Sequence, residues 1–260
     1  ASYYLVRTED VSSEYRVEEA YWLLGAEYAD SAGVDIITSS LGYYRYDDSS
    51  MDYQPDDLDG QTSLVTFAAE EASKKGILVL NSAGNEGNKD WKKVSFPSDG
   101  PNVLSVGAID SSLNVVSFSS RGPTADGRIK PEVMAVGFET IIIDPNGNIG
   151  IGYGTSYAAP QIAGLAASLW GSNPSKSSKD VRKAIIQSAD RFFNPDNDYG
   201  YGIPDFGMAF AELNAPDFND DEHIRIMPNP FTSNFRFRFG NIESEITNIY
   251  LYSITGRKMY

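Results

Sequence analysis

The sequence predicts an α/β fold built around a parallel β-sheet, because segments with helical periodicity alternate with short apolar strands. The β-branched run 34–38 has the composition of a buried strand, and a helix over 66–75 is followed by a second apolar strand over 77–80. Alternation of this kind predicts parallel pairing. A first helix before residue 33 is expected to bury one face, which carries Val17, Tyr21, Leu24 and Tyr28.

Small and polar residues follow both of these strands. The first strand leads into Ser40-Leu41-Gly42, and the second into Asn81-Ser82-Ala83-Gly84-Asn85. Ligands of open parallel sheets bind beyond the carboxyl ends of the strands. We therefore expect a functional site where these two segments meet.

Other patterns predict the remaining elements. Ser177 and Asp180 are spaced as a capping box, which predicts that a helix begins after Ser177. Short strands are expected over 3–7, 103–107, 115–119 and 141–143.

Composition excludes several classes of function. The 260-residue chain has a formal net charge of -15, which disfavours nucleic acid and anionic membranes as partners. It contains no cysteine, so disulfides, thiolate catalysis and cysteine-ligated zinc are excluded. No apolar run approaches the roughly 20 residues of a membrane-spanning helix.

The segment Gly154-Thr155-Ser156-Tyr157-Ala158-Ala159-Pro160, followed by a small-residue helix over 161–170, has the features of a nucleophile site. Pro160 suits a first helical turn, which needs no N–H from it. Ser156 would lie at the positive end of the helix dipole, beside free N–H groups able to bind an oxyanion. Taken alone, the same serine could simply cap a buried helix.

The loop 43–60 is strongly acidic, with aspartates that could in principle ligate calcium. Their spacing does not match an EF-hand loop, and a solvated acidic loop is the simpler interpretation. The sequence therefore predicts no metal ligand among Asp47, Asp48, Asp52, Asp56, Asp57 and Asp59.

Five motifs occur in order along residues 1–211. They are Ser40-Leu41-Gly42, Asn81 to Gly87, Phe118 to Pro123, Asp126 to Pro131 and Gly154 to Pro160. Together they resemble landmarks of the subtilisin-like serine proteases. The resemblance implies a three-layer α/β peptidase core that cleaves proteins or peptides, with no organic cofactor and with structural calcium a possibility in the parent protein.

The resemblance also implies roles for individual residues. Ser156 would be the acyl-accepting nucleophile, and Asn85 would donate to the oxyanion together with the backbone N–H of Ser156. Two backbone edges would pair with an extended substrate, and Ser95 would form the base of the pocket for the residue before the cut. The edges are Ser40, Leu41 and Gly42 on one side and Ser82, Ala83 and Gly84 on the other.

The sequence departs from the family in lacking a catalytic base. No Asp-Ser/Thr-Gly or His-Gly-Thr motif precedes Ser156, and the single histidine, His223, lies in an acidic stretch expected to be an exposed linker. Without a base a serine hydroxyl stays protonated and weakly nucleophilic. We therefore expect that the chain is a fragment that begins just after the histidine helix of a longer protein, so that the first part of the fold is missing.

The C-terminal region differs in character. Residues 214–223 are polar and acidic, as in a linker, and 224–260 alternate as strands. The Pro228-Asn229-Pro230-Phe231 and Ile254 to Lys258 segments resemble the start of the sorting domain by which many Bacteroidetes proteins leave through the type IX secretion machinery. A generic β-accessory domain is the alternative.

The sequence thus predicts a peptidase portion over 1–213, a linker over 214–223 and an incomplete β-sandwich over 224–260. The expected function is serine endopeptidase activity in the parent protein, secreted or at the cell surface. A non-catalytic secreted binding module with a degenerate peptidase fold remains the alternative.

Overall fold

The computed structural model describes residues 1–214, 224–227, 236–239, 250 and 257–259. The chain divides into two compact units, Ala1–Leu213 and Asn214–Tyr260. Most of the predicted linker, including His223, lies outside the described residues. In the second unit, β7 (Ile224–Met227) and β8 (Arg236–Phe239) form an antiparallel pair, and the rest of the predicted β-sandwich lies almost entirely outside the described residues.

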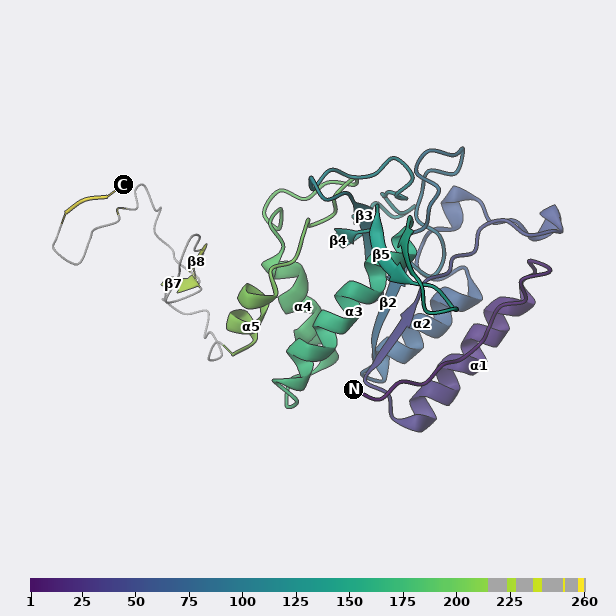
Figure 1. The fold of residues 1–260 in the computed structure, drawn as a ribbon, viewed down its shortest axis with the longest axis horizontal. Helices are drawn as coiled ribbons and strands as arrows, with labels where there is room; N and C mark the ends of the chain where they lie inside the picture. The colour runs from purple at the N-terminus through teal and green to yellow at the C-terminus, as the bar shows by residue number, and fades with distance from the viewer. Residues whose placement is uncertain (215–223, 228–235, 240–249, 251–256, 260) are drawn as a thin grey trace. The chain divides into compact units, whose positions relative to one another are not determined.

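A four-stranded parallel sheet forms the centre of the first unit (Figure 1). Its strands lie in chain order and are β1 (Ile36–Ser39), β2 (Leu78–Ser82), β3 (Leu104–Ile109) and β4 (Val133–Val136). The register places Ser39 opposite Asn81, so the two segments that follow these residues leave the sheet side by side.

Helices cover both faces of the sheet, which gives the three layers predicted. In β2, Leu78 and Leu80 pack into one core with α3, α4 and α5, while Val79 packs into the other with α1 and α2. This alternation is the two-residue period of a strand buried on both sides. The helices are α1 (Val17–Ala32), α2 (Leu64–Lys74), α3 (Thr155–Gly171), α4 (Ser178–Ser188) and α5 (Phe206–Asn214).

Shorter elements fill the connections. An antiparallel hairpin of β5 (Thr140–Ile143) and β6 (Ile149–Gly152) precedes α3, and two 3-10 turns, Ser49–Met51 and Pro55–Asp57, lie in the acidic loop. The Ser177 capping box is present as predicted, with the hydroxyl accepting from the Asp180 N–H at 3.2 Å. None of the described helices is both long and apolar enough to span a membrane.

Two expected strands are absent, and two observed strands were not expected. Residues 3–7 form no strand, and 115–119 form a turn with one isolated bridge at Val115, whereas β4 and β6 were not predicted. Residues 3–7 and 115–119 are apolar enough for strands, but a strand also needs a neighbouring strand that forms backbone hydrogen bonds with it.

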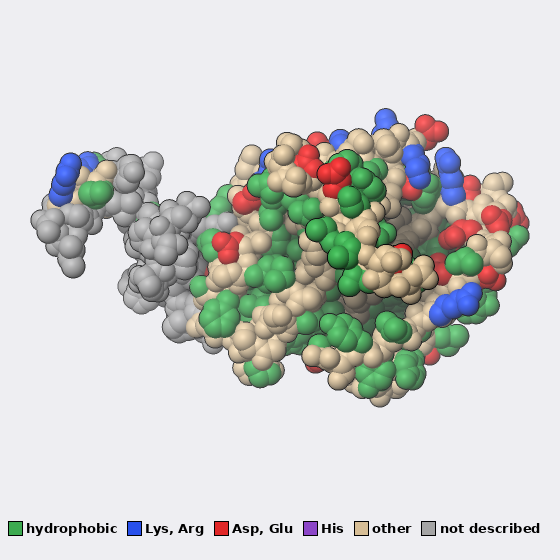
Figure 2. All heavy atoms as spheres, in the orientation of Figure 1, with side chains coloured by type: hydrophobic (Ala, Val, Ile, Leu, Met, Phe, Trp, Pro, Cys, Tyr) green, Lys and Arg blue, Asp and Glu red, His purple; other side chains and the backbone are tan. Residues whose placement is uncertain are grey.

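The predicted core face of α1 was also wrong. Val17, Tyr21, Leu24 and Tyr28 are each at least 46% exposed, and hydrophobic side chains are visible at the surface where α1 lies (Figure 2). The opposite face is buried, and it contains two acids beside its apolar members. It consists of Glu18, Glu19, Trp22 and Ala29.

Candidate active site

Ser156 lies in the first turn of α3 and is half-buried. The helix begins at Thr155, earlier than the 161–170 expected from sequence, so Pro160 lies inside the helix rather than in its first turn. The turn before the helix requires glycine, because the φ of Gly154 is 151°.

Pro160 shapes the backbone around Ser156. Proline has no N–H, so the carbonyl oxygen of Ser156, four residues earlier, lacks its helical donor. The Ser40 hydroxyl donates to that oxygen at 3.1 Å, and the Ser156 hydroxyl lies 3.5 Å from the Ser40 carbonyl oxygen. The segment after β1 is thus bonded directly to the start of α3.

Asn85 is held by the residue before Ser156. Its Oδ1 atom accepts from the Thr155 backbone N–H at 2.9 Å and from the Thr155 hydroxyl at 3.0 Å. The Thr155 hydroxyl in turn accepts from the Gly84 N–H at 3.2 Å. With its oxygen bound in this way, the amide nitrogen of Asn85 faces away from Thr155, and no described residue accepts a hydrogen bond from it.

Two N–H donors border the space beside Gly154. A Cβ atom added to Gly154 would lie 3.4 Å from Asn85 Nδ2, 3.6 Å from Asn85 Oδ1 and 3.7 Å from the Ser156 nitrogen. The Ser156 N–H belongs to the first helical turn, where N–H groups have no partner within the helix. Fixed neutral donors close to a reacting carbonyl group can stabilise a developing negative charge without reorganising.

A buried asparagine that was not singled out from the sequence joins the two expected substrate edges. Asn81 accepts from the Ser39 hydroxyl at 2.6 Å, and its Nδ2 donates to the carbonyl oxygens of Leu41 at 3.0 Å and Ser82 at 2.8 Å. These bonds fix the relative position of 40–42 and 82–84. The signal that could have identified it is a side-chain amide at a strand end, since Asn81 lies within the last residues of β2.

Ser95 lies between the two edges, where the sequence predicts the base of a pocket. It is 2% exposed, its N–H donates to the Ala83 carbonyl at 3.1 Å, and its hydroxyl has no hydrogen-bond partner. An added Cβ would come within 1.9 Å of the Ser95 hydroxyl at Gly42 and within 2.9 Å of it at Gly84. Only residues without a side chain fit around Ser95 at these positions.

Glu86 follows Asn85, and its charge is already matched. One oxygen pairs with Lys89 at 3.0 Å, and the other accepts from the Tyr44 hydroxyl at 2.5 Å. Burial, followed by this hydrogen bond, raises the pKa of Tyr44 to about 12. Glu86 is therefore a weaker source of negative potential than an unpaired carboxylate would be.

No catalytic base accompanies Ser156 within the described residues. The hydrogen-bond partner of its hydroxyl there is a carbonyl oxygen, and the single histidine of the chain lies outside the described part. Among the described residues, the candidate site therefore consists of Ser156, the two N–H groups near Gly154 and the backbone segments 40–42 and 82–84.

The acidic loop uses its aspartates to bind its own backbone. Asp48 accepts from the Ser50 N–H at 2.9 Å, Asp52 from the Tyr46 N–H at 2.8 Å, and Asp59 from the N–H groups of residues 61 and 62, both at 2.8 Å. Such bonds are typical of aspartate in turns.

Comparison with known proteins identifies the family. Residues 4–202 match the subtilase family, peptidase S8. The chain belongs to this family. Among curated subtilases, it is 32% identical over 191 residues to subtilisin E from Bacillus subtilis (strain 168), which covers 73% of this chain and 44% of that protein. The serine protease AprX of the same organism is 34% identical over 193 residues, covering 65% of this chain and 41% of AprX.

Solved structures agree with the subtilase fold. The self-cleaved protease domain of PatA superposes with a TM-score of 0.62 at 25% identity, covering 75% of this chain and 68% of that structure. Sphericase superposes with a TM-score of 0.58 at 26% identity, covering 73% and 63%. The chain thus has the subtilisin-like α/β fold, and it spans less than half the length of the two curated relatives.

Proposed function

We propose that this subtilase chain provides the nucleophile, the oxyanion site and the substrate-binding edges of a serine endopeptidase. The observation that carries the proposal is the arrangement around Gly154, where Asn85 Nδ2 and the Ser156 nitrogen both lie near the residue that precedes the helix of Ser156. Acyl transfer requires a hydroxyl nucleophile and hydrogen-bond donors that stabilise the oxyanion.

In the proposed reaction, Ser156 Oγ attacks the carbonyl carbon of the scissile peptide bond, and its proton passes to a histidine base. Negative charge develops on the carbonyl oxygen, which accepts from Asn85 and from the Ser156 N–H. Collapse of this intermediate releases the amine, which takes up the proton, and leaves an acyl-serine ester. Water then hydrolyses the ester. No step uses an organic cofactor.

The substrate is a protein or peptide bound in extended form between 40–42 and 82–84, with Ser95 at the base of the pocket for the residue before the cut. Backbone pairing along two edges gives affinity with little dependence on side chains. The hydrogen bonds of Asn81 support this assignment, because they hold both edges at a fixed separation.

The catalytic Asp and His are proposed to come from a part of the parent protein outside this chain. Peptide hydrolysis by the parent is expected to be lost on Ser156→Ala. The 260-residue chain alone should be indistinguishable from its own Ser156→Ala variant, since loss of the histidine in subtilisin itself lowers turnover about 2 × 10⁶-fold.

Two results would contradict these proposals. A parent Ser156→Ala variant that retains activity would exclude Ser156 as nucleophile, and activity of the isolated chain above its control would place the base within the chain. A parent that binds peptides but never cleaves them would favour the alternative, a secreted binding module.

We further propose that residues 224–260 begin a type IX sorting domain, so that the parent is secreted or at the cell surface. The support is the separation of the chain into two units near Leu213, together with the sequence motifs of the second. Deleting the complete sorting domain should retain the parent in the cell with its peptidase activity preserved. Normal secretion after the deletion would contradict the assignment.

A further inference from the structure

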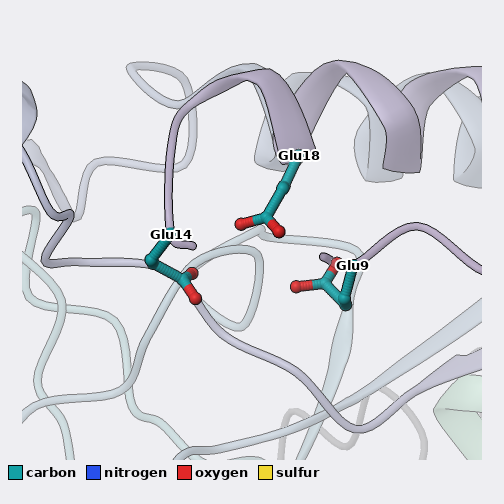
Figure 3. Close-up of side chains that lie close together, drawn as sticks. All are labelled: Glu9, Glu14 and Glu18. Carbon is teal, nitrogen blue, oxygen red and sulfur yellow. The ribbon is translucent and has the colours of Figure 1, made fainter. Parts of the chain in front are cut away.

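Three glutamates gather at the start of α1, away from the residues assigned to catalysis. Glu9 and Glu14 come from the segment before the helix, and Glu18 from its first turn. Each offers a carboxylate oxygen, and these oxygens all lie within 4.8 Å of one another. Figure 3 shows the three carboxylates turned toward a common space.

One oxygen of this cluster is buried without a hydrogen bond. Glu18 is 2% exposed; its Oε1 atom accepts from the Asp10 N–H at 2.7 Å, and its Oε2 atom has no partner. Leaving a buried carboxylate oxygen unpaired costs free energy, because water no longer solvates it. This oxygen therefore requires either a proton donor or a cation.

Nearby basic side chains do not neutralise the cluster. Arg7 donates through Nε to the backbone oxygen of Glu9 at 3.0 Å, and Arg16 donates through Nε to the backbone oxygen of Met51 at 2.8 Å. Among the described residues, none of the three glutamates forms an ion pair with Lys or Arg.

The electrostatics agree with an excess of negative charge. Burial, followed by the neighbouring Glu18, Glu9 and Asp47, raises the pKa of Glu14 to about 7. The three carboxylates lie close enough to repel one another, and a bound cation would relieve that repulsion.

We propose that Glu9, Glu14 and Glu18 bind a divalent cation of the Ca²⁺ type. The donor set is carboxylate oxygen alone, which suits a hard cation and not the nitrogen- and sulfur-binding transition metals. Calcium accepts six to eight oxygens in flexible geometry, so water completes the shell around three side chains.

The site connects the N-terminal segment with the substrate-binding edge. Glu9 accepts from the Tyr43 hydroxyl at 2.5 Å, and the Tyr43 backbone pairs with Phe96 in both directions, at 3.0 and 3.1 Å. Tyr43 directly follows Gly42, and Phe96 directly follows Ser95. A bound cation thus fixes the segment 9–18 and, through Tyr43, supports the wall and base of the proposed pocket.

Binding can be measured on the complete 260-residue chain after treatment with a chelator. Calorimetric titration with Ca²⁺ over about 10⁻⁷ to 10⁻³ M covers the sensor and extracellular ranges. We expect one bound ion and a Tm that rises with Ca²⁺. Terbium should give sensitised luminescence on excitation of tyrosine, because Tyr43 bonds to a ligand of the ion.

Glu14→Gln should weaken Ca²⁺ binding at least tenfold and remove the rise in Tm, and Glu18→Gln should do the same. Glu14 is only half-buried, so its variant tests the site even if Glu18→Gln impairs folding. The matched control Asp56→Asn removes one acid from the acidic loop and should leave binding unchanged.

Three outcomes would overturn the proposal. The first is no Ca²⁺ binding by the unmodified chain, and the second is Ca²⁺ binding that survives both glutamate substitutions. The third is a Glu14→Gln variant that is more stable than the unmodified chain while neither responds to Ca²⁺. That last result would mean that the cluster shares a proton instead.

Discussion

Ser40 donates its hydroxyl to the carbonyl oxygen of Ser156 at 3.1 Å, replacing the helical donor that Pro160 cannot supply. The two residues lie 116 positions apart, and this bond joins the end of β1 to the start of α3. It explains how a proline can follow the candidate nucleophile inside a helix while the carbonyl of the nucleophile keeps a hydrogen bond.

Ser40→Ala should lower the free energy of unfolding by about 0.5 to 1.5 kcal/mol, the usual net value of one hydrogen bond. The loss should be smaller in a Pro160→Ala background, because an alanine there supplies an N–H to the same oxygen. Urea denaturation of the unmodified chain, the two single variants and the double variant measures the coupling energy between Ser40 and Pro160.

Ser168→Ala is the matched control, since its hydroxyl donates to the Gly164 carbonyl at 3.0 Å within the same helix. That carbonyl keeps its helical N–H, so no coupling to Pro160 is expected. Equal effects of Ser40→Ala in both backgrounds would show that Ser40 does not replace the proline's missing donor.

Asn85→Asp should separate the two functions of Asn85 in the parent protein. An aspartate can still accept both Thr155 bonds, but it cannot donate to an oxyanion and adds a negative charge beside it. Turnover should fall by at least about 10² to 10³, which is the size of the loss when the matching asparagine of subtilisin is removed.

The KM in this variant should change much less than kcat, because the lost donor acts on the transition state. Asn88→Asp, in the same loop, adds the same charge three positions away and serves as control. A similar loss of turnover in both variants would point to general electrostatics and not to a specific donor.

Much of the site follows from local sequence rules. The small and polar segments after the first two strands and the serine near a helix start come from alternation and from side-chain size, whereas the roles of Asn85 and Ser95 came from the family resemblance. The position of Pro160 did not follow, because the start of α3 depends on Asn85 accepting from Thr155 across 70 positions. Local patterns carry no information about such a partner.

The inverted face of α1 has a similar cause. Glu19 is 1% exposed and accepts from the hydroxyls of Tyr46 and Tyr53, at 2.6 and 2.9 Å, and from the Val65 N–H at 3.0 Å. These partners lie 27 to 46 positions away in sequence. The predicted core face of α1 did not include Glu19, whose burial is favourable because three donors bind its carboxylate.

The raised pKa of Glu14 predicts a pH dependence of stability without divalent cations. Between the ordinary value of 4.5 and about 7, the folded chain holds a proton that the unfolded chain releases. Stability therefore falls as pH rises through this window. Asp99 changes stability with pH in the same direction as Glu14, because burial raises its pKa to about 6.

Glu14→Gln should flatten the decline of stability with pH between about pH 6 and 7. This window lies above the pKa of Asp99, so Asp99 contributes less to the decline there. Unfolding by urea at a series of pH values, in the presence of chelator, measures the slope. Excess Ca²⁺ should flatten the slope of the unmodified chain as well. An identical slope in the unmodified and Glu14→Gln chains would contradict the assigned cause.

The fit around Ser95 predicts that Gly42 cannot be enlarged. In Gly42→Ala the new methyl group would lie 1.9 Å from the Ser95 hydroxyl, which is buried and cannot easily move away. Thermal unfolding should show a lower Tm than for the unmodified chain. Adding Ser95→Gly should recover most of that loss, and a double variant no better than Gly42→Ala would place the clash elsewhere.

Comparing two free energies at the proposed pocket predicts the substrate preference. Burying a large apolar side chain contributes roughly 1.5 to 3 kcal/mol, whereas a solvent-exposed ion pair contributes about 1 kcal/mol or less. We therefore expect the parent to prefer Leu, Met, Phe or Tyr before the cut and to tolerate Lys or Arg, and the net charge of -15 on this chain should disfavour Asp or Glu. Because Lys89 and Tyr44 already bind Glu86, Glu86→Gln should change kcat/KM for Lys and Arg substrates only slightly. A fluorogenic peptide library at low and high salt measures this, and strong selection for Asp, Glu or Pro would show that the pocket is assigned to the wrong residues.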